Sequence, residues 1–123
     1  MRDIVFRGKL LSSGQWYHGV PIEHHGGDYW LLRGAVKLAV KPNTIGQYTG
    51  INDIYEKMIY EHDIIKVTDC YNNETIYAVD YKPGGFCANQ KGVNFSTNLG
   101  DLYNGKYNIE VIGNVYDNPE LMV

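Results

Sequence analysis

Three potentially reactive side chains, Glu61, His62 and Asp63, stand side by side in the stretch IYEHDIIKV (59–67). Two carboxylates and an imidazole could act as acid–base groups or as ligands of a metal ion. In an extended strand, however, neighbouring side chains point to opposite faces, so His62 would point away from the other two. We therefore expect a polar turn into a strand, in which Asp63 binds nearby backbone groups.

A second group of metal-binding residue types surrounds the expected turn at 26–27. Its members are Glu23, His24, His25 and Asp28. Adjacent histidines in an extended chain diverge, although the glycine turn could fold Asp28 back toward one of them. Structural zinc sites need three or four ligands at characteristic spacings, and neither group supplies them. The sequence predicts no metal and no cofactor.

Residues 100–107, GDLYNGKY, match the G-x-x-x-x-G-K pattern of a phosphate-binding loop. Such a loop needs Ser or Thr after the lysine to bind magnesium, and a helix must begin there. Tyr107 occupies that position and a strand-like pattern follows. We therefore expect a hairpin turn at Asn104–Gly105 and no nucleotide site.

Candidate nucleophiles lack the surroundings that would activate them. Ser12 and Ser13 lie in a turn without the strand-to-helix elbow of a hydrolase. Cys70 and Cys87 are too few for a disulfide framework, so we expect two reduced thiols. Cys87 follows two glycines, and we expect it to be the more exposed of the two. No catalytic residue is predicted, and we do not expect an enzyme.

The composition is that of a folded chain without a strong overall charge. Of the 123 residues, 44% are hydrophobic, which is enough for a sizeable core, and the net charge is −3. This mild acidity gives no basic footprint for nucleic acid, although a local patch remains compatible with it. No apolar run approaches the ~18 residues of a membrane span, and we expect a cytoplasmic protein without membrane contact.

Aromatic residues alternate with cations in the first third of the chain. The candidate interaction surface comprises Arg7, Trp16, Tyr17, Tyr29 and Trp30. Such residues on a β surface could stack on single-stranded nucleic acid. We favour the alternative, in which half of the aromatics fill the core and the rest form a contact between subunits, because half-wet aromatics are typical of interfaces.

The elements that position these residues are mainly short strands. Strand patterns occur at 3–11, 15–24, 29–40, 63–71, 74–81 and 106–116, and Gly, Pro and Asn turns separate them. The capping-box spacing of Asp53 and Glu56 predicts a helical turn within 51–60. A short helix fits within 95–105, and Asn118 and Pro119 predict one terminal helical turn. The chain is expected to be all-β or mostly β.

Three separated stretches resemble one known family. IVFRGKLLSSGQWYHG (4–19), IGQYTGINDIYEKMIYEHDIIKV (45–67) and VIGNVYDNPELM (111–122) are similar, in this order, to motifs of the YopX family. These are small phage and prophage proteins, chiefly of low-GC Gram-positive bacteria. The resemblance spans nearly the whole chain, but 20–44 and 82–105 carry no matching motif.

The resemblance implies a mostly-β fold. Its C-terminal part (45–123) would be a small SH3-like barrel and its N-terminal part (1–44) a β-hairpin or arm region, unless both form one continuous unit. It implies self-association and a host or phage protein as partner, but no established activity. Nucleic-acid binding by the barrel is the alternative.

The matching residues are of types that serve turns and caps. They are Thr49, Gly50, Glu61, Asp63, Gly113, Asn114, Asn118 and Pro119. His62 stands where the family pattern has glycine, so we expect it in a left-handed conformation if the turn requires positive φ. The residues 55–57 replace a family Asn-Gly turn, and this change favours a helical turn there.

Overall fold

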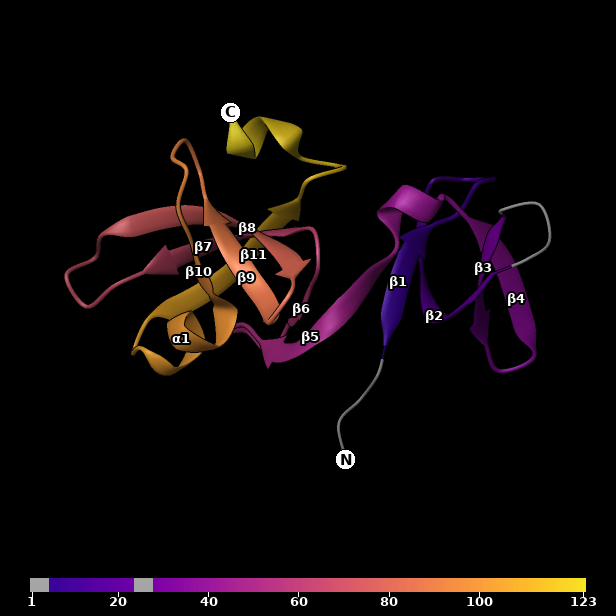
Figure 1. Cartoon of the computed structure of the whole chain (residues 1–123), viewed down its shortest axis with the longest axis horizontal. Coiled ribbons are helices and arrows are strands. Elements are labelled where there is room, and N and C mark those ends of the chain that lie inside the picture. Colours follow the sequence, from indigo (N-terminus) through magenta and orange to yellow (C-terminus); the bar gives the residue numbers. More distant parts are fainter. Residues whose placement is uncertain (1–4, 24–27) are drawn as a thin grey trace. The chain divides into compact units, whose positions relative to one another are not determined.

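The structure is a computed structural model that describes residues 5–23 and 28–123 (Figure 1). The chain divides into two compact units, residues 1–48 and 49–123. Both are built from antiparallel sheets, so the mostly-β prediction is confirmed. The expected boundary at 44/45 would place β5 (Gly46–Asn52) in one unit, whereas β5 begins in the first unit and ends in the second.

The N-terminal unit is a sheet of successive hairpins. Its strands are β1 (Phe6–Lys9), β2 (Trp16–Glu23), β3 (Tyr29–Arg33) and β4 (Val36–Val40), followed by the 3₁₀ turn η1 (Pro42–Thr44). The strand order is β4-β3-β2-β1, with the first half of β5 beside β1. A single bridge joins Leu10 to Val40, so the sheet curls until β4 meets the chain that leaves β1.

The inner side of this curl carries the core of the N-terminal unit. Leu31 and Val40 are 0% and 1% exposed. Gly8 faces them from β1, and a Cβ atom there would lie 3.3 Å from Val40 Cβ. Thr44 fastens η1 to β1, because its Oγ1 accepts from the Lys9 N–H at 2.8 Å and donates to the Lys41 carbonyl at 2.7 Å.

The C-terminal unit contains a five-stranded antiparallel sheet in the order β10-β9-β8-β7-β11. The bounds are β6 (Met58–Tyr60), β7 (Asp63–Thr68), β8 (Glu74–Lys82), β9 (Gly85–Gln90), β10 (Ser96–Asn98), α1 (Leu99–Asn104), β11 (Asn108–Asn114) and η2 (Pro119–Met122). The short helix α1 packs against β9, β10 and β11. Its Leu99 and Leu102 join a buried cluster that includes Ile59, Ile65 and Ile109.

Several expected elements differ from the structure. Within the described ranges neither sheet closes into a barrel, so the SH3-like barrel is not confirmed. The helical turn expected within 51–60 is wrong, because β5 and β6 occupy both sides of a tight turn there. The hairpin expected at Asn104–Gly105 is also wrong, because Asn104 ends α1 and Gly105 is its C-cap. The terminal turn from Pro119 is present as η2.

No helix in the described parts of the chain has the length and apolar character needed to cross a membrane.

Candidate functional site

The Glu61, His62 and Asp63 side chains do not converge on one point, but the expectation that His62 would point away from both carboxylates is wrong. Asp63 is 1% exposed, and its Oδ2 accepts a hydrogen bond from the Tyr60 N–H at 2.8 Å. Glu61 Oε2 and His62 Nε2 lie 3.6 Å apart, with side chains about one fifth exposed. Residues 61 and 62 form the turn between β6 and β7, so strand alternation does not govern them. Two side chains meet near the surface while the third serves the backbone inside.

His62 adopts the left-handed conformation, with φ of 78°. Its N–H donates to the Val79 carbonyl at 2.8 Å, and its carbonyl accepts from the Val115 N–H at 2.9 Å. The imidazole meets the Tyr116 ring edge-on, with centroids 5.3 Å apart. Two backbone hydrogen bonds and a ring contact therefore hold a non-glycine residue in this conformation, at a position where the family pattern has glycine.

Asp53 organises the β5–β6 turn, a role that the sequence motifs did not reveal. Its Oδ1 accepts from the N–H groups of Tyr55 and Lys57 at 2.8 and 2.9 Å. Its Oδ2 accepts from the Val111 N–H of β11 at 3.0 Å, across 58 positions of sequence. Burial alone would raise the pKa of Asp53, but these three N–H groups and the charge of Lys57 lower it below its ordinary value.

The same turn geometry occurs again at Asp69. Its Oδ1 accepts from the N–H groups of Tyr71 and Asn73 at 2.8 and 2.9 Å. The fourth residue of each turn has positive φ: Glu56 at 64° and Asn72 at 64°. The backbone of Asn73 is the main cause of a lowered Asp69 pKa. The hydrogen bonds of the Asp69 carboxylate to backbone N–H groups stay within its own turn, whereas Asp53 also accepts from Val111 of β11.

The two remaining family-like motifs are held by local hydrogen bonds. Thr49 Oγ1 donates to the Ile59 carbonyl at 2.8 Å, and the adjacent Gly50 has φ of 86°. At the C-terminal end, Asn114 Oδ1 accepts from the Tyr116 and Asp117 N–H groups at 3.0 and 2.9 Å.

Gly113 forms a bulge in β11 and lies against Asn118. The pairing register between β11 and β7 shifts between Val111 and Gly113. A Cβ atom at Gly113 would lie 2.5 Å from Asn118 Oδ1. That oxygen accepts from the Asn114 N–H at 3.2 Å instead of capping η2, although Asn118 precedes Pro119 at the N-cap position.

The other metal-like and phosphate-like patterns bring no ligands together. His24 and His25 lie outside the described residues, and Asp28 is exposed. Within the described residues no three His, Cys, Asp or Glu side chains gather around a point where a metal could sit. In the 100–107 pattern the helix α1 precedes Lys106, and β11 follows it, so a P-loop arrangement is absent.

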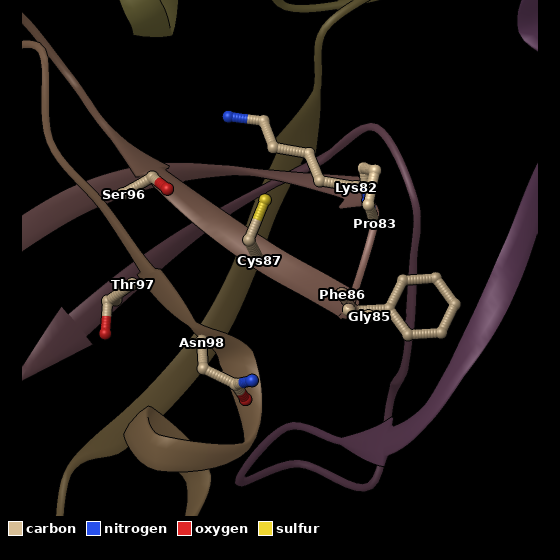
Figure 2. A pocket seen from close by; sticks show the side chains of 9 residues that line it. Lys82, Pro83, Gly85, Phe86, Cys87, Ser96, Thr97 and Asn98 are labelled. Atoms are coloured by element: carbon tan, nitrogen blue, oxygen red, sulfur yellow. The ribbon is translucent and has the colours of Figure 1, made fainter.

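Both cysteines are free, but their exposure is the reverse of our expectation. Cys70 is exposed and Cys87 is buried. Cys87 lines a cavity of about 330 Å³ beside the β8–β9 turn. Figure 2 shows the Ser96 hydroxyl turned toward Cys87, whereas the Thr97 and Asn98 side chains point elsewhere. The polar groups of this cavity do not converge on one point.

The candidate interaction residues divide between the two faces of the N-terminal sheet. Between β1 and β2, the register places Lys9 opposite Trp16 and Arg7 opposite His18. Further along the sheet, Trp30 of β3 lies opposite Ile22 of β2, and Lys37 of β4 lies opposite Leu32 of β3. Because cross-strand partners share a face, these residues lie on one side. Tyr17, Tyr29 and Leu31 alternate with them and face the other side. The five predicted residues therefore do not form one surface.

We define the Trp16 face by the charged and aromatic members of the first side. They are Arg7, Lys9, Trp16, His18, Trp30 and Lys37. The Arg7 guanidinium lies 4.3 Å from the Trp16 ring centroid and the Lys9 ammonium 5.3 Å. The Lys37 ammonium lies 5.4 Å from the Trp30 centroid. Burial, followed by the charges of Arg7 and Arg33, lowers the pKa of His18.

Formal charge is divided unevenly along the chain. Residues 1–48 contain six Lys and Arg against three Asp and Glu, a charge of +3. Residues 49–123 contain five Lys and Arg against eleven Asp and Glu, a charge of −6. The overall value of −3 therefore conceals a basic N-terminal unit.

A family model described as "YopX protein" matches residues 15–123. The crystal structure of protein EF1440 from Enterococcus faecalis is similar over 100% of both chains, with a TM-score of 0.62 and 21% identity. At that identity the likeness shows the fold alone. A comparison with curated proteins found no match.

Proposed function

Since the chain belongs to the YopX family, we propose that it is a non-enzymatic accessory protein of a phage or prophage. It acts in the bacterial cytoplasm through self-association and through contacts with host or phage proteins. The observation that carries this proposal is the exposed apolar character of β4. Val36 and Leu38 are 54% and 36% exposed, and β4 is the last strand of its sheet order.

The Val36–Leu38 part of β4 lies beyond the bridge between Val40 and Leu10 and the hydrogen bond from the Leu11 N–H to the Ala39 carbonyl. This part of an outermost strand can pair with a second chain, and its exposed apolar side chains favour such pairing. The neighbouring side chains are of the types that interfaces use. The Arg33 guanidinium lies 5.0 Å from the Tyr17 ring centroid, and the Tyr17 hydroxyl donates to the Val36 carbonyl at 3.3 Å. We call Tyr17, Arg33, Val36 and Leu38 the β4 surface.

Light scattering over a range of protein concentrations tests this proposal. The unaltered chain should associate, and Val36→Lys with Leu38→Glu should shift it toward monomer by at least tenfold in dissociation constant. Val93→Lys is the matched control, because Val93 is 55% exposed but lies in the C-terminal unit. A chain that stays monomeric at high concentration would refute self-association, and association unchanged by the double substitution would refute the role of β4.

A second candidate function, nucleic-acid binding, is supported by one observation: the charge of +3 on residues 1–48. Cationic groups attract phosphate locally even when the whole chain is acidic, because salt screens charges beyond about 10 Å. Oligonucleotide titrations at increasing salt test it. Binding should weaken steeply with salt, and flat titrations at low salt would exclude it.

A further inference from the structure

We propose that the Trp16 face binds single-stranded nucleic acid, with Lys9 and Lys37 contacting phosphates and Trp16 and Trp30 contacting bases. This inference rests on the second candidate function and assigns it a site. The face is separate from the β4 surface, because the residues of the two surfaces alternate along the same strands and point to opposite sides of the sheet.

The first support is the residue content of the face. Single-strand sites combine aromatic rings, on which bases stack, with cations that follow the phosphate backbone. Each tryptophan here has a lysine ammonium within 5.4 Å of its ring centroid.

The second support is the spacing of the two rings. Trp16 begins β2, and Trp30 pairs with Ile22 six positions further along the same strand. At about 3.3 Å per residue, the two positions are roughly 20 Å apart. This length suits a short single strand, since a small β fold covers roughly 4–16 nucleotides. Val20 and Ile22, 54% and 38% exposed, offer apolar surface between the rings.

The third support is the packing beneath the face. Arg7 is only 9% exposed and lies over the Trp16 ring, so it fixes the ring and adds positive potential without itself reaching far into solvent. A fixed ring loses little side-chain entropy when a base stacks on it. Lys9 and Lys37 are the more accessible cations and are assigned to phosphate.

A single strand fits this face better than a duplex. Duplex readers insert a helix or a ribbon into a groove, whereas a sheet face with aromatic rings suits bases that are already unstacked. Because only two cations are assigned to phosphate, the face contacts few phosphates, so stacking must supply much of the affinity. An acidic protein could also bind a face that carries cations, and the experiment below distinguishes it from a single strand by a poly-glutamate peptide.

The chain itself supplies a reporter, because Trp16 and Trp30 are its only tryptophans. A labelled twelve-nucleotide dT strand, a duplex of equal length and a poly-glutamate peptide are each titrated into the full chain at low salt. Anisotropy of the label and tryptophan fluorescence are recorded together. We expect the single strand to bind and to quench the tryptophans, the duplex to bind at least tenfold more weakly, and the peptide not to bind.

Two double substitutions locate the site. Lys9→Glu with Lys37→Glu should weaken single-strand binding at least tenfold and reduce the salt slope by about 1.4, since each phosphate contact contributes about 0.7. Lys82→Glu with Lys106→Glu makes the same charge change at two exposed positions of the C-terminal unit and should change affinity less than threefold.

Each contrary result has a distinct meaning. Single-strand binding that leaves tryptophan fluorescence and the Lys9/Lys37 variant unaffected would refute this face but keep nucleic-acid binding. Equal binding of the duplex would refute the preference for single strands, and binding of the peptide alone would assign the face to an acidic protein. Absence of all binding at low salt would refute both the face and the second candidate function.

Discussion

Two residues occupy left-handed backbone positions where the family pattern favours glycine. His62 and Glu56 have φ of 78° and 64°. A side chain in this region costs roughly 1–2 kcal/mol relative to an ordinary conformation. The surrounding bonds impose the conformation on His62, because its N–H donates to Val79 of β8 and its carbonyl accepts from Val115, which follows β11.

Replacement of His62 by glycine should stabilise the chain. We expect His62→Gly to raise the free energy of unfolding by about 1 kcal/mol, since glycine adopts positive φ without steric cost. Urea denaturation measures it. His62→Ala is the matched control, because alanine keeps the strain and loses the contact with Tyr116. A glycine variant no more stable than the alanine variant would contradict the strain argument.

At the scale of elements, one turn design connects β5 to β6 and β7 to β8. In both, an aspartate oxygen accepts from the N–H groups two and four residues later. The Asp53–Glu56 pair has the spacing of a capping box, which led to the wrong expectation of a helix. Aspartate serves helix caps and tight turns through the same local bonds, so only the strands on either side decide between them.

Asp53→Asn should destabilise the chain by roughly 1–3 kcal/mol at neutral pH, because an amide cannot accept on both sides from three N–H groups. Asp69→Asn is the matched control and should cost less, since the bond to Val111 is specific to Asp53. Chemical denaturation of both variants measures the difference. Equal losses would show that the bond to β11 contributes nothing.

The Asp53 effect should depend on pH with a definite sign. The folded-state pKa of Asp53 lies below its ordinary value of 3.8, so its stabilising contribution is complete above 3.8. It is lost as the pH falls through the lower, folded-state pKa. Denaturation at a series of pH values should therefore show the unaltered chain and Asp53→Asn converging in acid. A constant difference down to the lowest pH would contradict this linkage.

The bulge of β11 depends on close packing between Gly113 and Asn118. Gly113→Ala should lower the free energy of unfolding by about 1–3 kcal/mol, because the new methyl group would overlap Asn118 Oδ1. Asn118→Ala removes the obstacle together with its bond to Asn114. In a double-mutant cycle the two losses should therefore be less than additive. Full additivity would indicate that the two positions do not interact.

At the scale of the whole molecule, the two thiols report on different events. Cys70 is exposed, whereas Cys87 lies on β9 between its neighbours β8 and β10. A thiol reagent should modify Cys70 at once and Cys87 much more slowly, because Cys87 is only 9% exposed and is reached only through the cavity that it lines. Labelling followed by peptide mass spectrometry distinguishes them, and Cys70→Ser isolates the slow reaction. Two fast reactions in the native chain would contradict the burial of Cys87.

Sequence alone determined the features that depend on neighbouring residues. Strand periodicity, Gly and Pro turns and the three ordered motifs were enough for the mostly-β class and the family. They were also enough to predict a polar turn at Glu61–Asp63 in which Asp63 binds the backbone, although the Glu61 and His62 side chains meet there against the expectation from strand alternation. The turn after Asn118 was predictable because Pro119 suits the first position of a helical turn, although Asn118 does not cap it, and the short helix within 95–105 was one of two alternatives that the sequence left open.

Only the tertiary structure decided which distant residues meet. Pairing of β1 with β2 and of β2 with β3 placed Trp16 and Trp30 on one side and Tyr17 and Tyr29 on the other, although all four belong to the same stretch of sequence. The carboxylate of Asp53 reaches β11 across 58 positions, and Cys87 is buried beside a cavity that is lined by residues of the β8–β9 turn and of β10. Composition and spacing specify local geometry, whereas strand register, which is set by packing between distant segments, assigns each side chain to a face.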